Sequence, residues 1–234
     1  MKKQKPIINV PETKLCHVKL TKKHIEQESK KRVSRITNEF ARGFSFLRDY
    51  PKSVTFFGSA RLKETNIHYK KAQSIAERLS KLGYAIVTGG GPGIMEAANR
   101  GAHDAGGPSL GLNIKLPSEQ VTNPYVTKST EFHYFFSRKV ALSFAAEAYL
   151  YFPGGFGTLD EFFEILTLVQ THRIAPIPII LVGTDYWNPL DAFIKKNLAE
   201  KHKSISKRDM KLYTITDDED TIIKMVEKAP LRDE

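Results

Sequence analysis

Short apolar segments that end in glycine-containing loops recur along this chain, and a helix-like segment follows most of them. Residues 53–60 precede an amphipathic segment at 69–83, and residues 84–91 precede another at 94–107. Further strands are expected at 109–114, 148–155, 177–183 and 212–216, and further helices at 132–147, 159–170, 189–200 and from Asp217. Apolar strands separated by helices of about 10 to 15 residues are typical of parallel sheets covered on both faces. We therefore expect an α/β, doubly wound, mostly parallel, Rossmann-like fold.

The first fifty residues differ in character from the rest and are expected to form a separate region. They hold 13 Lys and Arg against 5 Asp and Glu, whereas the other residues hold 23 against 21, so most of the net charge of +10 lies here. Residues 1–50 are predicted to be a basic arm followed by an extra N-terminal helix, which begins after the N-cap Thr21 and ends before Pro51. Residues 51–234 are predicted to be a Rossmann-like nucleotide-binding domain.

Composition excludes several classes of protein. No apolar run approaches the roughly 20 residues that span a bilayer, and the N-terminus lacks the apolar region of a signal peptide, so a cytoplasmic protein without membrane contact is expected. The single cysteine, Cys16, allows no disulfide framework and no CxxC zinc pair, and the histidines show no metal-ligand spacing. We expect no metal.

The loop "TGGGPG" follows a predicted strand and opens a predicted helix, which is where backbone N–H groups bind anions such as phosphate. Its glycines are Gly89, Gly90, Gly91 and Gly93. Their spacing does not fit the G-x-G-x-x-G of dinucleotide-binding proteins, and the chain contains no G-x-x-x-x-G-K-[ST] motif. We therefore expect no cofactor. The alternative is a tight turn that simply requires glycine.

The stretch "PGGFGTLDE" forms a second glycine-rich loop at the carboxyl end of another strand. Thr158 and Glu161 have the spacing of a capping box, which alone could explain both side chains. Capping does not explain the preceding glycines, which favour a second anion site. The loop "FGSAR" follows the first strand at the same edge of the sheet. Two glycine-rich loops in one sheet, "TGGGPG" and the loop within "PGGFGTLDE", predict a ligand that has a phosphate and a second group to be held.

These motifs resemble the LOG (LONELY GUY) family of nucleoside 5′-monophosphate phosphoribohydrolases, whose signature is PGGxGTxxE with an upstream Arg-Lys pair. The signature residues here are Pro153, Gly154, Gly155, Gly157, Thr158 and Glu161, with Arg138 and Lys139 upstream. The stretch "GGGPGIME" is shorter than the usual GGGxxGLMG and has Glu96 where glycine is usual. In this it is similar to longer bacterial members of the superfamily, including nucleotide nucleosidases. The name lysine decarboxylase, given to some relatives, has no support in the sequence.

The resemblance implies hydrolysis of the N-glycosidic bond of a nucleoside 5′-monophosphate to free base and ribose 5-phosphate. It implies catalytic roles for Arg138 and Glu161, with the carboxylate stabilising an oxocarbenium-like transition state and activating water. Both AMP and N6-modified AMP remain open as substrates. Substrate and phosphate contacts are predicted at Gly58, Ser59, Gly89, Gly90, Gly91, Gly93, Glu96, Lys139, Gly154, Gly155, Gly157 and Thr158.

Two other interpretations stay open. A protein of the same fold could bind a nucleotide as a sensor or carrier without turnover. The basic arm could contact nucleic acid, although a solvated lysine-rich tail explains it more simply. Residues 1–50 have no counterpart in the minimal LOG domain, and the resemblance implies a homodimer or a higher homo-oligomer.

Overall fold

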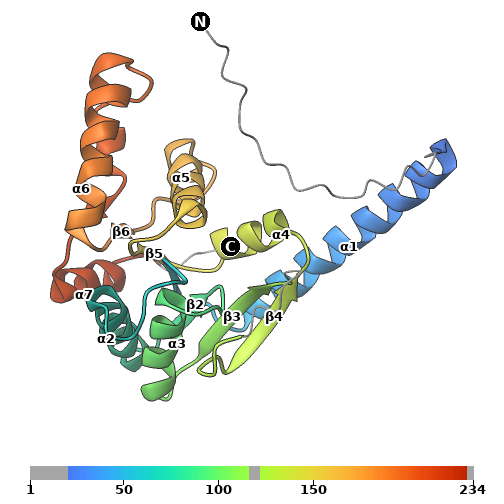
Figure 1. Ribbon diagram of the computed structural model, residues 1–234, viewed down its shortest axis with the longest axis horizontal. Coiled ribbons are helices and arrows are strands. Elements are labelled where there is room, and N and C mark those ends of the chain that lie inside the picture. The colour runs from blue at the N-terminus through green and yellow to red at the C-terminus, as the bar shows by residue number, and fades with distance from the viewer. Residues whose placement is uncertain (1–20, 116–121, 231–234) are drawn as a thin grey trace, which may run out of the picture. The chain divides into compact units, whose positions relative to one another are not determined.

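The computed structural model describes residues 21–115 and 122–230, and in these ranges strands and helices alternate as the sequence predicts (Figure 1). The strands are β1 (Ser53–Phe57), β2 (Ala85–Thr88), β3 (Ser109–Ile114), β4 (Lys128–Phe132), β5 (Ala148–Tyr151), β6 (Ile179–Leu181) and β7 (Thr214–Ile215). The helices are α1 (Lys22–Arg48), α2 (Ile67–Lys81), α3 (Ile94–Asp104), α4 (Phe135–Ser143), α5 (Phe156–Gln170), α6 (Thr184–Phe193) and α7 (Glu219–Glu227). A π-helical segment, Ile194–Lys201, continues α6, and a 3-10 turn occupies Asp209–Lys211.

All seven strands join one sheet in the order β4-β3-β2-β1-β5-β6-β7, and every pairing is parallel. The doubly wound fold expected from the sequence is therefore confirmed. The chain builds outward from β1 in one direction through β4 and then returns to β5 on the other side of β1. This reversal between β1 and β5 is the topological switch point, outside which such sheets bind their ligands.

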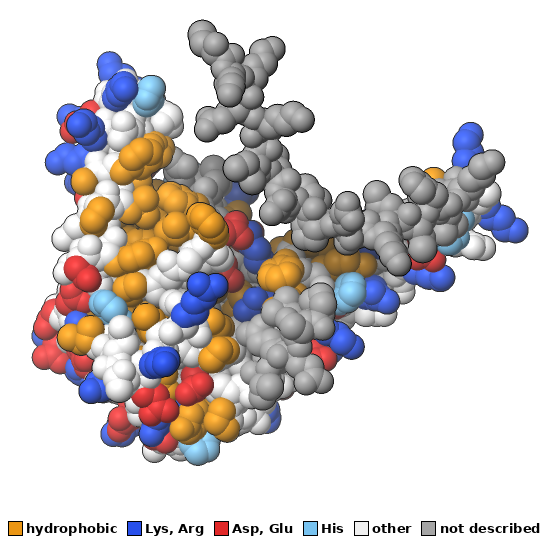
Figure 2. All heavy atoms as spheres, in the orientation of Figure 1, with side chains coloured by type: hydrophobic (Ala, Val, Ile, Leu, Met, Phe, Trp, Pro, Cys, Tyr) orange, Lys and Arg blue, Asp and Glu red, His pale blue; other side chains and the backbone are white. Residues whose placement is uncertain are grey.

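Alternating residues of the central strands fill two apolar cores, one on each face of the sheet. On one face Val54 and Phe56 of β1 pack with apolar side chains of α2, α3 and α7. On the other face Phe57 stacks on Tyr151 with ring centroids 4.9 Å apart, in a core that includes side chains of α4 and α5. Figure 2 shows acidic and basic side chains mixed over α2 and α7, where Arg78 pairs with Asp220 at 2.6 Å. Charged side chains therefore cover this part of the surface, while the central strands are buried on both faces.

The chain divides into two compact units, Met1–Arg35 and Ile36–Glu234, and the division falls inside α1. In the described part of the first unit, the Thr21 hydroxyl accepts a hydrogen bond from the His24 amide at 3.2 Å, so the predicted N-cap of this helix is confirmed. The second half of α1 belongs to the unit that contains the sheet. Among the described residues, no helix has the length and apolar character needed to cross a membrane.

Three sequence expectations about secondary structure are wrong. The sequence does not predict strand β4, because its residues KSTEF are mostly polar and its burial alternates at the edge of the sheet. Helix α6 begins at Thr184 and contains Pro189, whereas the sequence predicts a helix that opens at this proline. The last helix begins at Glu219, because Asp217 binds elsewhere: its carboxylate accepts hydrogen bonds from Gly183 N and Thr184 N, each at 3.0 Å, and so holds the start of α6.

Candidate active site

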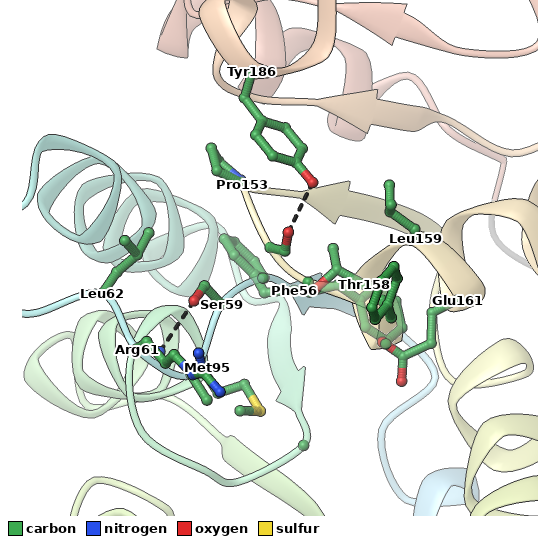
Figure 3. Close-up of a pocket in the computed structure, with 18 of the residues that line it drawn as sticks. Phe56, Ser59, Arg61, Leu62, Met95, Pro153, Thr158, Leu159, Glu161 and Tyr186 are labelled. Atoms are coloured by element: carbon green, nitrogen blue, oxygen red, sulfur yellow. Dashed lines mark hydrogen bonds between the residues drawn. The ribbon is translucent and has the colours of Figure 1, made fainter. Parts of the chain in front are cut away.

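A cavity of about 920 Å³ lies outside the carboxyl ends of β1, β2 and β5, at the switch point of the sheet. The loop 58–62 after β1 and the segment 153–159 after β5 form most of its wall. In Figure 3, Thr158 and Glu161 of α5 lie across from Ser59, Arg61 and Met95. Of the predicted site residues, the cavity brings together Gly58, Ser59, Gly89, Arg138, Gly154, Gly155, Gly157, Thr158 and Glu161.

Helix α5 starts at the cavity without a side-chain cap. Its N-cap residue is Gly155, which places Thr158 third in the helix, and no side chain caps the first turn. The predicted capping box of Thr158 and Glu161 is therefore wrong, because the helix begins earlier than the box requires. The backbone N–H groups of a first helical turn have no hydrogen-bond partner within the helix, and residues 155–159 line the cavity. This turn therefore favours an anion.

The glycines of this loop divide into two kinds. Gly154 packs against the Thr158 side chain, and its carbonyl accepts a hydrogen bond from the Tyr186 hydroxyl at 2.8 Å (Figure 3). At Gly155 and Gly157, in contrast, a Cβ atom would meet no other atom within 4 Å. Packing therefore explains glycine at position 154 but not at 155 and 157, where the backbone is left open toward the cavity.

Gly157→Ala tests this difference. A glycine within a helix is about 0.5–1 kcal/mol less favourable than alanine, so the variant should unfold at the same or a slightly higher temperature than the unmodified protein. Its methyl group would occupy the space that an anion needs beside the first turn. We expect binding of ribose 5-phosphate, measured by calorimetry, to weaken by about tenfold or more, roughly the value of one charge-assisted hydrogen bond. Unchanged affinity would show that the ligand does not approach this turn.

The first glycine-rich loop contributes less to the cavity than expected. Only Gly89 lines it, and a side chain at this position would overlap the Arg138 guanidinium. Gly90 and Gly93 have φ near +70°, and the Gly90 and Gly91 carbonyls accept hydrogen bonds from Asn123. Gly90, Gly91 and Gly93 lie outside the lining of the cavity. Backbone conformation and packing therefore account for Gly90 and Gly93.

Two charged residues predicted to contact substrate also lie outside the lining. Glu96 accepts a hydrogen bond from the Tyr69 hydroxyl at 3.0 Å. The Lys139 ammonium lies 2.7 Å from Asp160 and 3.0 Å from Glu164. Lys139 is therefore held by two carboxylates, whereas Arg138, the other member of the signature pair, reaches the cavity.

Arg138 is held by the neighbouring strand rather than by an acid. Its Nε donates a hydrogen bond to the Leu112 carbonyl at 2.7 Å, and its guanidinium lies against Gly89. Burial lowers the pKa of Arg138, and the nearby charge of Glu161 acts in the opposite direction. Arginine stays protonated despite such a shift, so it supplies a fixed positive charge to the cavity.

Glu161 is the one carboxylate in the lining of the cavity. Burial raises the pKa of Glu161 to about 7, against the opposing charge of Arg138. No hydrogen bond or ion pair within 4 Å joins its carboxylate to another described residue. A carboxylate with these properties is present in both protonation states near neutral pH and can exchange a proton with a ligand or water.

The residues that line the cavity but were not predicted as site residues include Arg61, Met95 and Tyr186. Arg61 is exposed and forms no ion pair with any residue in the described ranges. It lies in "FGSAR", so its place directly after a strand at the switch point could have identified it. Tyr186 belongs to α6, and no motif in the sequence marks it as a cavity residue.

Among the described residues, no three His, Cys, Asp or Glu side chains lie together as a metal site.

The fold and this cavity define a doubly wound α/β protein with a glycine-lined, anion-favouring cleft at the switch point. The chain belongs to the LOG family, whose sequence model carries the description "Possible lysine decarboxylase" and matches residues 95–226.

A relative in Oryza sativa subsp. japonica, named a probable cytokinin riboside 5′-monophosphate phosphoribohydrolase, is 32% identical over 157 residues. The match covers 64% of this chain and 62% of the relative, so the chain spans less than two thirds of that protein's length. The crystal structure titled TM1055 has a TM-score of 0.59 and 24% identity, covering 76% of this chain and 99% of that one. The molybdenum cofactor carrier protein of Chlamydomonas reinhardtii has a TM-score of 0.56 and 20% identity, covering 76% and 98%. At these identities the two structures show the fold alone.

Proposed function

We propose that this protein hydrolyses the N-glycosidic bond of a nucleoside 5′-monophosphate, giving a free base and ribose 5-phosphate. The observation that carries the proposal is Glu161, a carboxylate whose pKa is raised to about 7 and on which the fixed charge of Arg138 acts. Its cavity is lined in part by the open backbone of glycines. The relative named a phosphoribohydrolase supports the same reaction class.

The phosphate would lie at the start of α5. The uncapped N–H groups of the first turn, the Thr158 hydroxyl and the open backbone at Gly155 and Gly157 suit a small dianion. Ser59 and Arg61 face this turn from the loop after β1. A guanidinium without an acidic partner would add a charge-assisted contact to the phosphate.

The ribose would then extend from this turn toward Glu161 and Arg138. As the bond from the anomeric carbon to the base breaks, its electron pair leaves with the base, and positive charge develops on the sugar. The Glu161 carboxylate would stabilise that charge and accept a proton from the attacking water, and the departing base would take up a proton so that it leaves as the neutral free base. Arg138 would favour the ionised carboxylate before this step, since an opposite charge nearby favours the ionised form.

The base would lie against the apolar part of the cavity wall, to which Leu62, Met95 and Phe156 contribute. AMP and N6-modified AMP both carry a planar base that such a wall could accept. Phe156 is 94% exposed, so a ligand covering it would bury apolar surface that now faces water. Both nucleotides are therefore candidate substrates, and a difference in their rates of base release would separate them.

The test is an assay of the purified full chain with a panel of nucleoside monophosphates, including AMP and N6-isopentenyl-AMP. Free base is measured by chromatography and ribose 5-phosphate by an enzyme-coupled assay, and the Glu161→Gln variant serves as the inactive control. We expect at least one nucleotide to release both products in equal amounts. Tight binding of a nucleotide without release from any member of the panel would favour a sensor or carrier and contradict the hydrolase.

A further inference from the structure

Helix α4, which carries Arg138, is capped by a residue from another helix. Its own N-cap residue, Tyr134, makes no side-chain cap hydrogen bond. Instead the carboxylate of Glu39 in α1 accepts hydrogen bonds from His133 N at 2.8 Å and from Tyr134 N at 3.3 Å. The Ser137 hydroxyl donates a third hydrogen bond to the same carboxylate. The start of α4 is therefore tied to a side chain almost a hundred residues earlier in the chain.

Other contacts of α1 hold the same junction. Gly43 lies so close to Phe132 and Ala141 that a side chain there would crowd both. The Arg42 guanidinium donates a hydrogen bond to the Glu131 carbonyl. All of these residues belong to the compact unit Ile36–Glu234. The second half of α1 thus holds the end of β4 and the beginning of α4 together.

Because Glu39 is buried, its carboxylate depends on its hydrogen bonds within the protein. The residue is only 3% exposed, and a buried carboxylate that loses its hydrogen bonds is strongly unfavourable. Its position at a helix N-terminus adds a favourable interaction with the helix dipole. Because all three donors lie in the segment 133–137, the carboxylate is satisfied only when this segment has its present position.

Arg138 follows Ser137 directly, so the position of this segment determines where the guanidinium can reach. From this place Arg138 Nε reaches the Leu112 carbonyl at 2.7 Å and its charge acts on Glu161. We propose that Glu39 is a positioning residue that fixes the start of α4 and thereby holds the Arg138 guanidinium beside the Glu161 carboxylate. The extra N-terminal helix is then a support of the active site, and this role rests on the proposed function of Arg138 and Glu161.

The test is the ionisation of Glu161 in the Glu39→Ala variant, followed by NMR of carbon-13-labelled glutamate side chains. Glu161→Gln identifies the Glu161 signal. Glu28→Ala is the matched control, because Glu28 is on the same helix and, among the described residues, forms an ion pair only with Lys31. The charged groups acting on Glu161 are Arg138, Asp160, Lys139 and Glu164. Asp160, Glu164 and Glu161 itself all belong to α5, which Glu39 does not touch. The two cations, Arg138 and Lys139, both belong to α4, and Arg138 has the larger effect on Glu161, so displacement of Arg138 should be the main change.

We expect Glu39→Ala to raise the pKa of Glu161, since the positive charge that favours its ionised form moves away. We expect kcat for nucleotide hydrolysis to fall by about tenfold to a hundredfold, as a catalytic group displaced by about 1 Å would cause, with a smaller change in KM. Glu28→Ala should change neither quantity. An unchanged Glu161 titration in a folded Glu39→Ala protein would overturn the proposal, because loss of stability alone does not shift this pKa.

A second variant covers the case in which Glu39→Ala does not fold. Ser137→Ala keeps the carboxylate and its two backbone donors and removes only the hydroxyl, so we expect a smaller shift of Glu161 in the same direction. No shift in this variant would also overturn the proposal. Should the unmodified protein hydrolyse no nucleotide, a shifted Glu161 titration would still support the positioning role, while the hydrolase proposal alone would fail.

Discussion

Glu161→Gln is expected to remove at least 99% of the hydrolytic rate while the protein stays folded and still binds its ligand. The amide has the same size as the carboxylate but cannot accept the proton of the attacking water or balance positive charge on the sugar. Loss of a general base costs about 10²- to 10⁴-fold. The measurement is kcat from release of free base, together with nucleotide affinity by calorimetry.

The melting temperature of Glu161→Gln shows whether Glu161 serves catalysis or the stability of the fold. The pKa of Glu161 is raised from 4.5 to about 7 in the folded protein, so ionisation of this group opposes folding. That penalty is absent below the unfolded pKa, grows as the pH rises, and is complete above about pH 7. Glu161→Gln should therefore melt at least as high as the unmodified protein, with a larger advantage at pH 8 than at pH 5. A variant that melts lower at pH 8 would point to a structural role for Glu161.

Arg138→Lys should have the second largest effect, even though it keeps a positive charge. Lysine cannot donate to the Leu112 carbonyl as the guanidinium Nε does and still present a planar group beside Gly89. We expect kcat to fall by about 10²- to 10³-fold, the usual loss when one preorganised donor is removed. Lys139→Ala, which removes the neighbouring cation that Asp160 and Glu164 hold, should cause a much smaller loss.

The pH dependence of the rate provides a second test of Arg138→Lys. If Glu161 acts as the carboxylate in the proposed reaction, the rate of the unmodified protein should fall as the pH drops below about 7, approaching tenfold per pH unit. Arg138 favours the ionised form of Glu161, and displacing its charge should move this acidic limb to higher pH. An acidic limb at the same pH in Arg138→Lys would show that the two charges do not act on each other during turnover.

The sequence predicted the features that depend on short stretches of chain. Apolar strands and glycine-bounded helices gave the doubly wound sheet, and the carboxyl ends of its strands then gave the position of the cavity. Arg138 and Glu161 came from the family motif, and the structure places both in the same cavity. Their chemical roles remain predictions.

The features that sequence reasoning missed depend on contacts between distant segments. Glu39 looks like an ordinary polar position of an amphipathic helix, and only the folded chain shows that it meets the start of α4. The edge strand β4 lacks an apolar pattern because one side of it faces solvent. The glycines of "GGG" look alike in sequence, but only Gly89 faces the cavity, since Gly90 and Gly91 are engaged by Asn123.

Because the start of α5 is uncapped, ligand binding is expected to stabilise this part of the helix. In α2 and α7 the side chains of Asn66 and Asp218 cap the first turn, whereas α5 leaves the position beside Gly155 and Gly157 open. A bound anion would complete the helix, so part of the binding free energy would appear as order in the loop after β5. Without a ligand, the first turn would then be the least stable part of α5. Binding of the substrate would order the site that acts on it.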